Sequence, residues 1–329
     1  MNEPLISVIL PVYNVERYVA AAIQSVLNQT YRNFELIILN DASTDGSKEI
    51  IFSFTDSRIR YVENERNLML IKTLNKGVGL AKGKYIARMD ADDICVPSRF
   101  ERQICFLERD QTYIMCGSWA KIIDSDGNKT GRIKRIDSDG LLKVNMLFTT
   151  PFVHPTVMIR TDALKKNLYS EEALHCEDME LWSRLAMNES FRFANIPEYL
   201  LNYRWHDRNI SVEHSVHQSN FRSKVLGPYV ERLSGTLTED DSRTHFSLFE
   251  SNVDFKNSCI REKTRKWIRF LLEQNATKKI YDESDLKALL LSRWFLLNVR
   301  SRRFYMFSSG ISLFSRSVFI KAFRLLYYK

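Results

Sequence analysis

The sequence predicts an α/β protein, built on a mostly parallel sheet with flanking helices, followed by a C-terminal helical region. Over the first part of the chain, short apolar runs alternate with segments whose apolar residues recur at helical spacing. Repeated strand–helix units of this length form parallel sheets with helices on both faces. After about residue 212 only helical periodicity remains. We therefore expect a first domain over 1–212 and a helical region over 213–329.

Four apolar runs are the expected strands of the first half. They lie at Leu5–Leu10, Phe34–Leu39, Ile59–Val62 and Tyr85–Met89. Leu5–Leu10 and Phe34–Leu39 are short and mostly apolar, which is typical of a buried parallel strand, and Ile59–Val62 is a third, shorter strand. We expect Asn14 to cap a helix that runs to about Leu27, and further helices after Gly46 and near Ile71–Lys82.

The middle of the chain and the C-terminal part complete the expected elements. Tyr113–Gly117 and Trp119–Ile123 are expected strands, Asp124–Gly127 is a hairpin turn and Asp139–Phe148 is a helix. Five C-terminal helices are expected, at about His214–Leu233, Thr238–Val253, Arg261–Gln274, Ser284–Ser301 and Ser312–Tyr327.

Composition limits the class of protein. Hydrophobic residues make up 44% and charged residues 27%, which is ordinary for a soluble globular protein. The five cysteines are odd in number and have no paired spacing, which indicates a reducing compartment. No basic segment with an apolar run opens the chain, and no run of apolar residues reaches membrane-spanning length. These features predict a cytoplasmic protein.

The positive charge of the chain is concentrated at the C-terminus. Residues 286–329 contain nine Lys and Arg and no Asp or Glu, together with many aromatic residues. In the last predicted helix, five apolar residues fall on one face: Ile311, Phe314, Val318, Ala322 and Leu325. Basic side chains beside such a face suit an anionic membrane surface, so we expect peripheral contact with the inner face of the cell membrane. The alternative is that this face packs on the first domain. No nucleic-acid-binding motif accompanies the charge.

Three polar clusters follow predicted strands of the first half. They are Pro11–Asn14, Asn40–Asp45 and Asp90–Asp93. Ligands of parallel sheets bind beyond the carboxyl ends of the strands, so these clusters should meet at one edge. Taken singly, Asp41 could be a helix cap and Tyr13 a half-buried aromatic residue. Together the clusters predict a nucleotide site.

The third cluster holds three carboxylates, Asp90, Asp92 and Asp93. Hard divalent cations such as Mg²⁺ and Mn²⁺ prefer oxygen ligands, and Mg²⁺ usually takes one or two carboxylates plus substrate phosphates. The simpler interpretation of such a run is a solvated acidic turn. Its position directly after a predicted strand favours the metal.

Six segments of the first 211 residues resemble glycosyltransferase family 2, whose members have the GT-A fold. These are Ser7–Asn14, Glu35–Gly46, Lys82–Asp93, Phe152–Arg160, Cys176–Trp182, and Tyr203–His206 with Ile210–Ser211. They stand in the family's order. One segment departs from the pattern, since Leu68-Met69-Leu70 follows Asn67 where the family commonly has a glycine.

The resemblance implies an inverting, metal-dependent enzyme of bacterial surface-polysaccharide synthesis. It implies a nucleotide-sugar donor, with UDP the expected nucleotide, and a saccharide or lipid-linked saccharide acceptor. The donor-binding candidates are Pro11, Tyr13, Asn14, Asp41, Lys72 and Asp90. Asp92 is the expected ligand of Mn²⁺ or Mg²⁺, and His206 either completes the metal shell or is an ordinary loop histidine. Lys72 could equally be a surface base.

The resemblance also identifies Asp178 as the general base and Glu177 as its supporting group. A carboxylate within reach of the acceptor hydroxyl is the simplest base for this reaction. Asp178 begins a predicted helix at Met179–Asn188, whose dipole favours the ionised carboxylate. The alternative is that either carboxylate only caps that helix. Trp119 either lines a sugar pocket or belongs to the core.

Other classes fit less well. The glycines of Gly77–Gly83 end a helix and precede a strand, the reverse of a dinucleotide-binding fingerprint. A sugar nucleotidyltransferase would carry a glycine-rich loop at Pro11–Asn14, and a processive synthase would carry a Gln-x-x-Arg-Trp motif and membrane spans. A non-catalytic relative acting as a binding or scaffold protein would be expected to lose carboxylates. Here Asp41, Asp90, Asp92 and Asp178 are all present.

Overall fold

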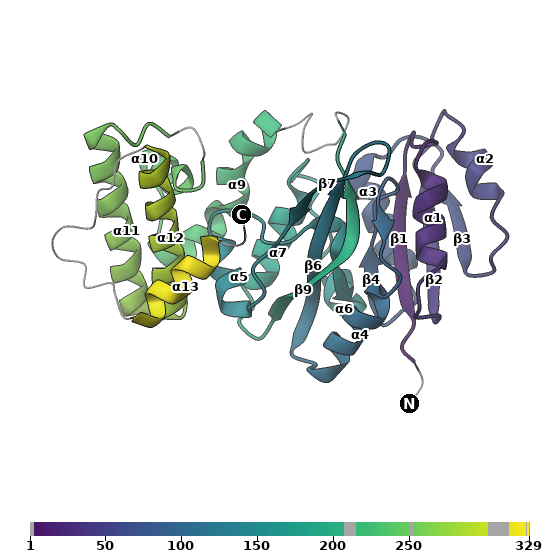
Figure 1. The fold of residues 1–329 in the computed structure, drawn as a ribbon, viewed down its shortest axis with the longest axis horizontal. Coiled ribbons are helices and arrows are strands. Elements are labelled where there is room, and N and C mark those ends of the chain that lie inside the picture. The colour runs from purple at the N-terminus through teal and green to yellow at the C-terminus, as the bar shows by residue number, and fades with distance from the viewer. Residues whose placement is uncertain (1–2, 207–214, 251–252, 302–315, 327, 329) are drawn as a thin grey trace.

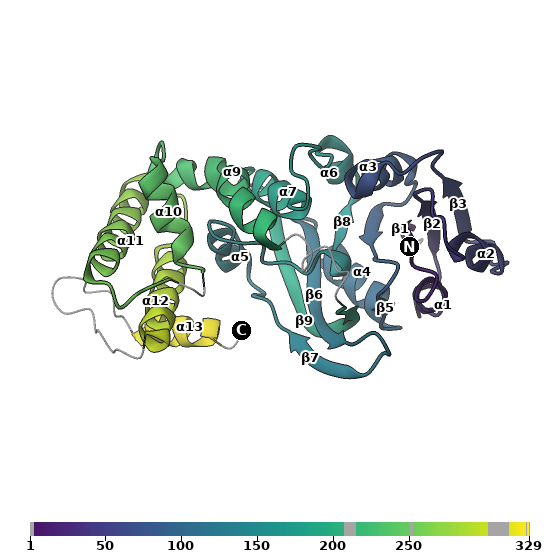
Figure 2. The same ribbon diagram turned by 90° about the horizontal axis from the view of Figure 1, so that it is seen from above.

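The computed structural model describes residues 3–206, 215–250, 253–301, 316–326 and 328. A nine-stranded sheet with flanking helices forms the larger part of the molecule, and a group of helices lies beyond one end of it (Figure 1). Figure 2 shows the strand β3 and the C-terminal helices at opposite ends of the long axis. The α/β part and the helical region therefore follow one another in space as they do in the sequence.

The first four strands pair in parallel, in the order β3-β2-β1-β4. They are β1 (Ile6–Val12), β2 (Phe34–Asn40), β3 (Ile59–Glu63) and β4 (Tyr85–Arg88), which confirms the four predicted strands. Alternate residues enter two separate cores. Ile9 and Ile37 pack on one face of the sheet, and Val8 and Leu36 on the other. The helices α1 (Val19–Leu27), α2 (Ser47–Phe52) and α3 (Met69–Leu80) connect these strands.

The predicted cap at Asn14 is wrong. Helix α1 begins at Val19, with Tyr18 rather than Asn14 at its N-cap. Asn14 has a positive φ of 50°, and its side-chain oxygen accepts a hydrogen bond from the backbone of Thr44, 2.8 Å away. Its side chain therefore ties two loops together, and several residues separate it from the helix.

The second half of the sheet is mixed. Its strands are β5 (Ile94–Cys95), β6 (Tyr113–Ile123), β7 (Lys129–Ile133), β8 (Met158–Arg160) and β9 (Arg192–Arg204). Strands β6 and β9 are parallel, whereas β4 with β8, β8 with β6, β6 with β7, and β5 with β9 are antiparallel. The two strands predicted on either side of Ser118 are one continuous strand, whose register with β9 shifts at Trp119. The predicted hairpin turn is confirmed, with Gly127 at φ 91° between β6 and β7.

Further helices cover this half of the sheet. They are α4 (Arg99–Arg109), α5 (Asp139–Asn145), α6 (Thr161–Lys166) and α7 (Glu177–Ala186), with a short 3₁₀ turn η1 (His154–Thr156). Helix α4 was not predicted, although Phe100, Ile104 and Leu107 are buried at helical spacing along it. Helix α7 begins two residues before the predicted start, so Asp178 lies within its first turn.

The C-terminal region contains α9 (Ser215–Ser234), α10 (Glu239–Ser247), α11 (Ser258–Lys278), α12 (Glu283–Arg300) and α13 (Arg316–Leu326). These helices match the five predicted ones apart from their ends. They share a hydrophobic core with the α/β part: Phe148 stacks on His245 and Phe249, with ring centroids 4.3 and 4.6 Å apart. The predicted domain boundary at 212 lies outside the described residues. None of the described helices is both long and apolar enough to span a bilayer.

The apolar face predicted for the last helix packs inside the protein. Val318, Ala322 and Leu325 are buried at the contact of α13 with α12, while Ile311 and Phe314 lie outside the described residues. This face therefore packs on α12 of the helical region, whereas the packing alternative placed it on the first domain. The opposite face of α13 is the exposed one, and it carries Phe319, Ile320 and Phe323, which are 48%, 51% and 52% exposed.

Candidate active site

Hydrogen bonds bring together the loops that follow β1 and β2. The backbone of Asn14 donates to Ser43 Oγ over 3.1 Å, and the backbone of Glu16 donates to Asp45 Oδ2 over 2.9 Å. Strand β1 also pairs with β4, which ends just before Asp90. The three predicted polar clusters therefore meet at the carboxyl edge of the sheet, as the strand order requires.

Asp41 is buried at this edge and organises the loop before α3. Its Oδ1 accepts hydrogen bonds from Asn64 Nδ2 at 2.7 Å and from the backbone of Leu68 at 2.8 Å. Leu68 is the N-cap residue of α3. Asp41 thus fixes the loop that departs from the family pattern, and both of these bonds use the same carboxylate oxygen.

The three carboxylates of Asp90, Asp92 and Asp93 form a compact acidic cluster. Each offers an oxygen within 4.8 Å of the others. Burial, together with the charges of Asp92 and Asp90, raises the pKa of Asp93 well above its usual value. Asp93 Oδ1 accepts a hydrogen bond from the backbone of Arg204, whereas its Oδ2 is buried with no partner among the described residues.

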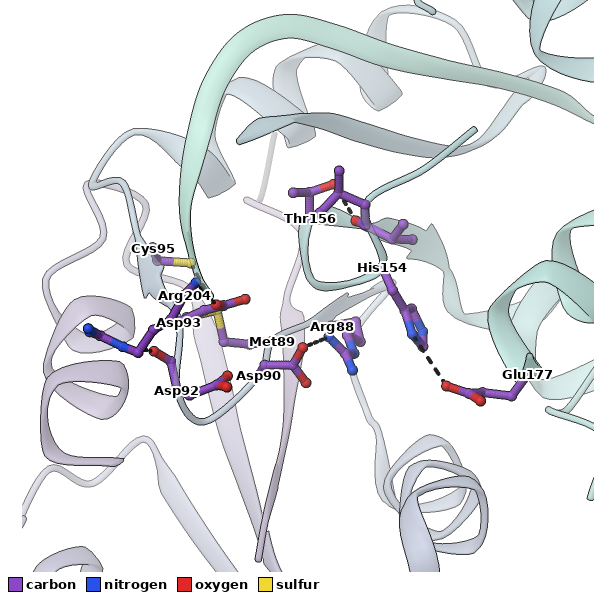
Figure 3. Close-up of polar contacts among 12 residues, drawn as sticks. Arg88, Met89, Asp90, Asp92, Asp93, Cys95, His154, Thr156, Glu177 and Arg204 are labelled. Carbon is purple, nitrogen blue, oxygen red and sulfur yellow. Dashed lines mark hydrogen bonds and ion pairs between the residues drawn. The ribbon is translucent and has the colours of Figure 1, made fainter. Parts of the chain in front are cut away.

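The end of β9 covers the acidic cluster. His206 Nε2 lies 3.1 Å from Asp92 Oδ2. Figure 3 shows Arg204, whose Nε donates to the backbone oxygen of Asp92. Tyr18 holds both side chains: its ring stacks on His206 at 5.6 Å and lies 4.6 Å from the Arg204 guanidinium. The predicted partnership of Asp92 and His206 is therefore present in the geometry.

These residues fit a hard divalent cation. Carboxylates crowded into a buried site repel one another, and each gains from a nearby positive charge. Asp90 already has an ion-pair partner in Arg88. The buried Asp93 Oδ2 has none in the described structure, and oxygen donors are the ligands that Mg²⁺ and Mn²⁺ prefer.

A second pair of carboxylates, Glu177 and Asp178, begins α7. Asp178 Oδ1 accepts a hydrogen bond from the backbone of Met179 at 2.7 Å, and Thr150 Oγ1 lies 3.4 Å from Oδ2. Burial raises the pKa of Asp178, and burial with the charge of Asp178 raises that of Glu177 to about 7. The expectation that the helix dipole keeps Asp178 readily ionised is therefore wrong in direction, because burial outweighs the dipole.

Arg88 and His154 lie between the two carboxylate groups (Figure 3). His154 Nδ1 is 3.9 Å from Glu177 Oε1, and its Nε2 is 2.9 Å from Tyr169 Oη. Burial and the nearby Arg88 lower the pKa of His154 well below its usual value, so the imidazole is neutral. Two polar contacts therefore flank this space: Arg88 pairs with Asp90 on one side, and His154 lies near Glu177 on the other.

Three of these residues had no predicted role. Arg88 and His154 stand inside segments that carry the family resemblance, so their positions offered a signal. Tyr169 lies in a loop and offered none. Of the predicted donor residues, Pro11, Tyr13, Asn14, Asp41 and Asp90 lie at the sheet edge. Lys72 is exposed on α3 and pairs with Glu171 at 3.4 Å, and no described contact joins it to the acidic cluster.

The fold and the paired carboxylate groups define a glycosyltransferase of the GT-A class. The model of the Glycosyl transferase family 2 matches residues 7–168. A relative from Bacillus subtilis, the putative glycosyltransferase EpsE, is 37% identical over 208 residues, which cover 61% of this chain and 73% of the relative. The chain belongs to glycosyltransferase family 2.

Other known proteins resemble the chain as well. The Escherichia coli protein WfgD, a UDP-Glc:alpha-D-GlcNAc-diphosphoundecaprenol beta-1,3-glucosyltransferase, is 28% identical over 70% of this chain and 88% of its own. The S. aureus TarS structure (1–349) in complex with UDP-GlcNAc has a TM-score of 0.60 at 16% identity, covering 93% of this chain and 94% of that chain. The mannosyltransferase PcManGT from Pyrobaculum calidifontis, in complex with GDP-Man and Mn²⁺, has a TM-score of 0.56 at 14% identity. The match covers 92% of this chain and 88% of that chain. Both structures share the fold of this chain.

Proposed function

We propose that the enzyme is an inverting, metal-dependent transferase in surface-polysaccharide synthesis. It moves a sugar from a UDP-sugar to a saccharide or lipid-linked saccharide. The observation that carries the proposal is the presence of two carboxylate groups, Asp90–Asp93 and Glu177–Asp178, on either side of Arg88 and His154. The glucosyltransferase WfgD, whose name gives a UDP-Glc donor and a diphosphoundecaprenol-linked acceptor, and the UDP-GlcNAc complex of TarS support the donor and acceptor classes.

The donor nucleotide binds at the carboxyl edge of the sheet in this proposal. Pro11, Tyr13 and Asn14 offer one wall, and Asp41 the buried polar end of the pocket. Tyr13 is 48% exposed, so its ring is accessible to a stacking base. Asp90 contacts the ribose or the metal, and Lys72 on α3 lies at the margin, where it neutralises donor charge.

Asp92 and His206 would hold the divalent cation, with the free oxygen of Asp93 as a further ligand. When bound, Mn²⁺ or Mg²⁺ supplies positive charge to the departing diphosphate. The chain itself orders these ligands. Tyr18 stacks on His206, and Arg204 donates from its backbone N to the Asp93 carboxylate and from its Nε to the backbone oxygen of Asp92. The Mn²⁺ held by the PcManGT structure supports this assignment.

Asp178 is the general base of the proposed reaction. Its raised pKa makes its carboxylate a stronger base than an exposed aspartate. Thr150 and the backbone of Met179 orient the two oxygens. Glu177, whose pKa is raised to about 7, lies beside Asp178. Its Oε1 is 3.9 Å from Nδ1 of the neutral His154. A base on the side opposite the leaving diphosphate implies in-line attack and inversion at the anomeric carbon.

The enzyme works at the inner face of the cell membrane in this proposal. The exposed face of α13, with Phe319, Ile320 and Phe323, continues onto Phe295 of α12, whose ring lies 6.0 Å from that of Phe323. Arg324 is exposed beside these rings. An aromatic patch with a neighbouring base suits an anionic lipid surface.

A donor panel tests the proposed reaction. UDP- and GDP-sugars are incubated with the full chain and Mn²⁺ or Mg²⁺, and hydrolysis or binding is measured with and without EDTA. Metal-dependent use of a UDP-sugar is the expected result, after which soluble and lipid-linked saccharides are compared as acceptors. Binding of no nucleotide sugar under any of these conditions would refute the proposal.

A further inference from the structure

A cluster of aromatic and basic side chains lies on β6, β7 and β9, apart from the donor and base residues assigned above. The basic–aromatic cluster consists of Trp119, Lys121, Arg132, Lys134, Arg135 and Tyr199. The rings of Trp119 and Tyr199 are 5.3 Å apart. Lys121 Nζ and Arg132 Cζ lie 6.0 and 5.8 Å from the centre of the Tyr199 ring, and Lys134 Nζ lies 5.5 Å from that of Trp119. Three cations thus surround one aromatic pair.

Two buried polar atoms of this cluster lack partners within the part of the chain that the structure describes. They are Arg135 Nε and Tyr199 Oη. Nearly all buried polar atoms in proteins are hydrogen-bonded, so an orphaned donor calls for a ligand, an ion or a water. Both atoms are donors, and a ligand with acceptor oxygens would satisfy both.

The charge of the cluster points the same way. No ion pair among the described residues involves Lys121, Arg132 or Arg135. Lys121 and Arg132 are direct neighbours across the β6–β7 pair. Like charges held this close repel each other and raise the local affinity for an anion.

The cluster borders the proposed base. Trp119 Nε1 donates to the backbone oxygen of Arg135 at 2.9 Å. Asn195 Nδ2 donates both to Ile136 O at 2.7 Å and to Pro151 O at 3.1 Å, which holds the segment after Arg135 against the segment after Thr150. Thr150 in turn contacts Asp178. These contacts place the segment after Arg135 close to the segment that carries Thr150, and so close to the proposed base.

We infer that the basic–aromatic cluster is an acceptor subsite and that the acceptor carries a phosphate or diphosphate group. This rests on the proposed transferase function and narrows its acceptor class. The acceptor sugar packs on the aromatic pair, because aromatic faces suit sugar rings. The phosphate oxygens accept hydrogen bonds from Arg135 and Tyr199 and pair with Lys121 and Arg132. A neutral saccharide would leave these cations unpaired, so the subsite discriminates against it.

Two matched probes test the inference. One is N-acetylglucosamine joined through a diphosphate to an undecyl chain, and the other is the same sugar on a neutral undecyl glycoside. Binding to the full chain is measured by calorimetry with UDP and Mn²⁺ at saturation. The diphosphate probe should bind about tenfold or more tightly than the neutral one, with a preference that falls as salt rises.

Variants assign the preference to the cluster. Lys121→Gln and Arg132→Gln should each weaken the diphosphate probe by about tenfold while leaving the neutral probe and UDP unchanged. Lys129→Gln is the matched control, since Lys129 is an exposed base on the same hairpin outside the cluster. Inorganic pyrophosphate should compete with the diphosphate probe.

Other outcomes overturn the inference. Equal affinity of the wild type for the two probes, or no binding of either, rules out an anionic acceptor subsite. If Lys129→Gln and Arg132→Gln lose the same affinity for the diphosphate probe, the preference comes from general surface charge and not from the cluster. If Arg132→Gln weakens binding to phosphatidylglycerol vesicles and not to the probe, the cluster binds lipid headgroups instead. Failure of the wild type to bind UDP would count against the proposed function itself.

Discussion

At the scale of single residues, burial raises the pKa of the carboxylates at the candidate site. Burial raises the pKa of Asp90, Asp93, Glu177 and Asp178. Each is therefore a stronger base than an exposed carboxylate, and each is stabilised by a cation brought close to it. Arg88 supplies one such charge to Asp90. Metal binding should supply another and release protons as it does so.

The first prediction concerns the metal ligand. Asp92→Asn should lower kcat/KM by about 10²-fold or more, because the variant loses a charged oxygen from the diphosphate site. Circular dichroism should show an intact fold. Asp126→Asn is the control, because Asp126 is exposed on the β6–β7 turn and pairs with Arg17. Full activity of Asp92→Asn, or of the wild type in EDTA, would contradict the metal assignment.

The second prediction separates donor binding from transfer. Asp178→Asn should keep its affinity for the nucleotide sugar and lose about 10²-fold or more of transfer, because only the proton acceptor is removed. Glu180→Gln on the same helix, where Glu180 pairs with Arg184, is the control. Joint loss of donor binding and transfer would make Asp178 a donor-binding or structural residue. The anomeric configuration of the product, read by NMR, checks the inversion.

The third prediction concerns stability and pH in the metal-free protein. Folded Glu177 keeps its proton up to a pKa of about 7, whereas the unfolded chain releases it near 4.5. Between these values the folded state binds more protons, so this residue lowers the free energy of unfolding as pH rises. Glu177→Gln should remove this loss, which amounts to roughly 1–3 kcal/mol between about pH 5 and pH 8. Urea unfolding of the variant and the wild type at both pH values measures this change in the free energy of unfolding. An equal change with pH in the two proteins would contradict the raised pKa of Glu177.

Sequence reasoning identified the carboxylates of the site and missed their neighbours. Asp92 and Asp41 were predictable because carboxylates that follow strands carry a recognisable chemistry, and Asp178 was identified through the family resemblance. Arg88 and His154 acquire their roles only through burial and through partners distant in the chain. Burial also reversed the expected pKa shift of Asp178, and no local pattern reports the desolvation of a side chain.

At the scale of elements, the strands β1, β2 and β4 were predictable because each is largely buried and mostly apolar, whereas β3 is only half-buried. The later strands carry a weaker signal. Strand β6 is buried from Ile114 to Ser118 and then mixes buried with half-buried residues. Its register with β9 shifts around Trp119, where the sequence was divided into two short strands. The antiparallel partners β8 and β5 are only three and two residues long, too short for periodicity to detect.

The fourth prediction tests the close approach of β4 to β1. A Cβ added at Gly83 would lie 2.6 Å from both Leu5 O and Ser7 N, which are backbone atoms and cannot rotate away. Gly83→Ala should therefore lower the free energy of unfolding by about 2 kcal/mol. Gly79→Ala in α3 is the control, since nothing lies within 4 Å of its added Cβ, and it should raise stability by about 0.5–1 kcal/mol. Thermal unfolding of both variants measures the difference in stability. Similar melting temperatures for Gly83→Ala and Gly79→Ala would contradict the close approach of the two backbones.

At the scale of the whole molecule, the C-terminal helices are joined to the α/β part by polar contacts as well as by packing. His245 Nε2 lies 2.8 Å from Leu147 O, its Nδ1 accepts from Trp267, and Tyr229 donates to Lys143 O. These contacts hold α9, α10 and α11 against the segment that leads from α5 to Thr150. A rigid helical region therefore sets the orientation of α13 relative to the active site.

That orientation leads to the last prediction, on membrane attachment. The buried side of α13 leaves Phe319 and Phe323 outward, with ring centroids 5.1 Å apart. Phe319→Ser with Phe323→Ser should release the enzyme from phosphatidylglycerol vesicles in a flotation assay, because the apolar contact is lost while the α12 packing is kept. Salt should weaken wild-type binding, since bases such as Arg324 contribute to it. Phe52→Ser is the control, because Phe52 is 59% exposed on α2 at the other end of the molecule. Equal flotation of both variants, or binding that ignores lipid charge, would contradict attachment through α13.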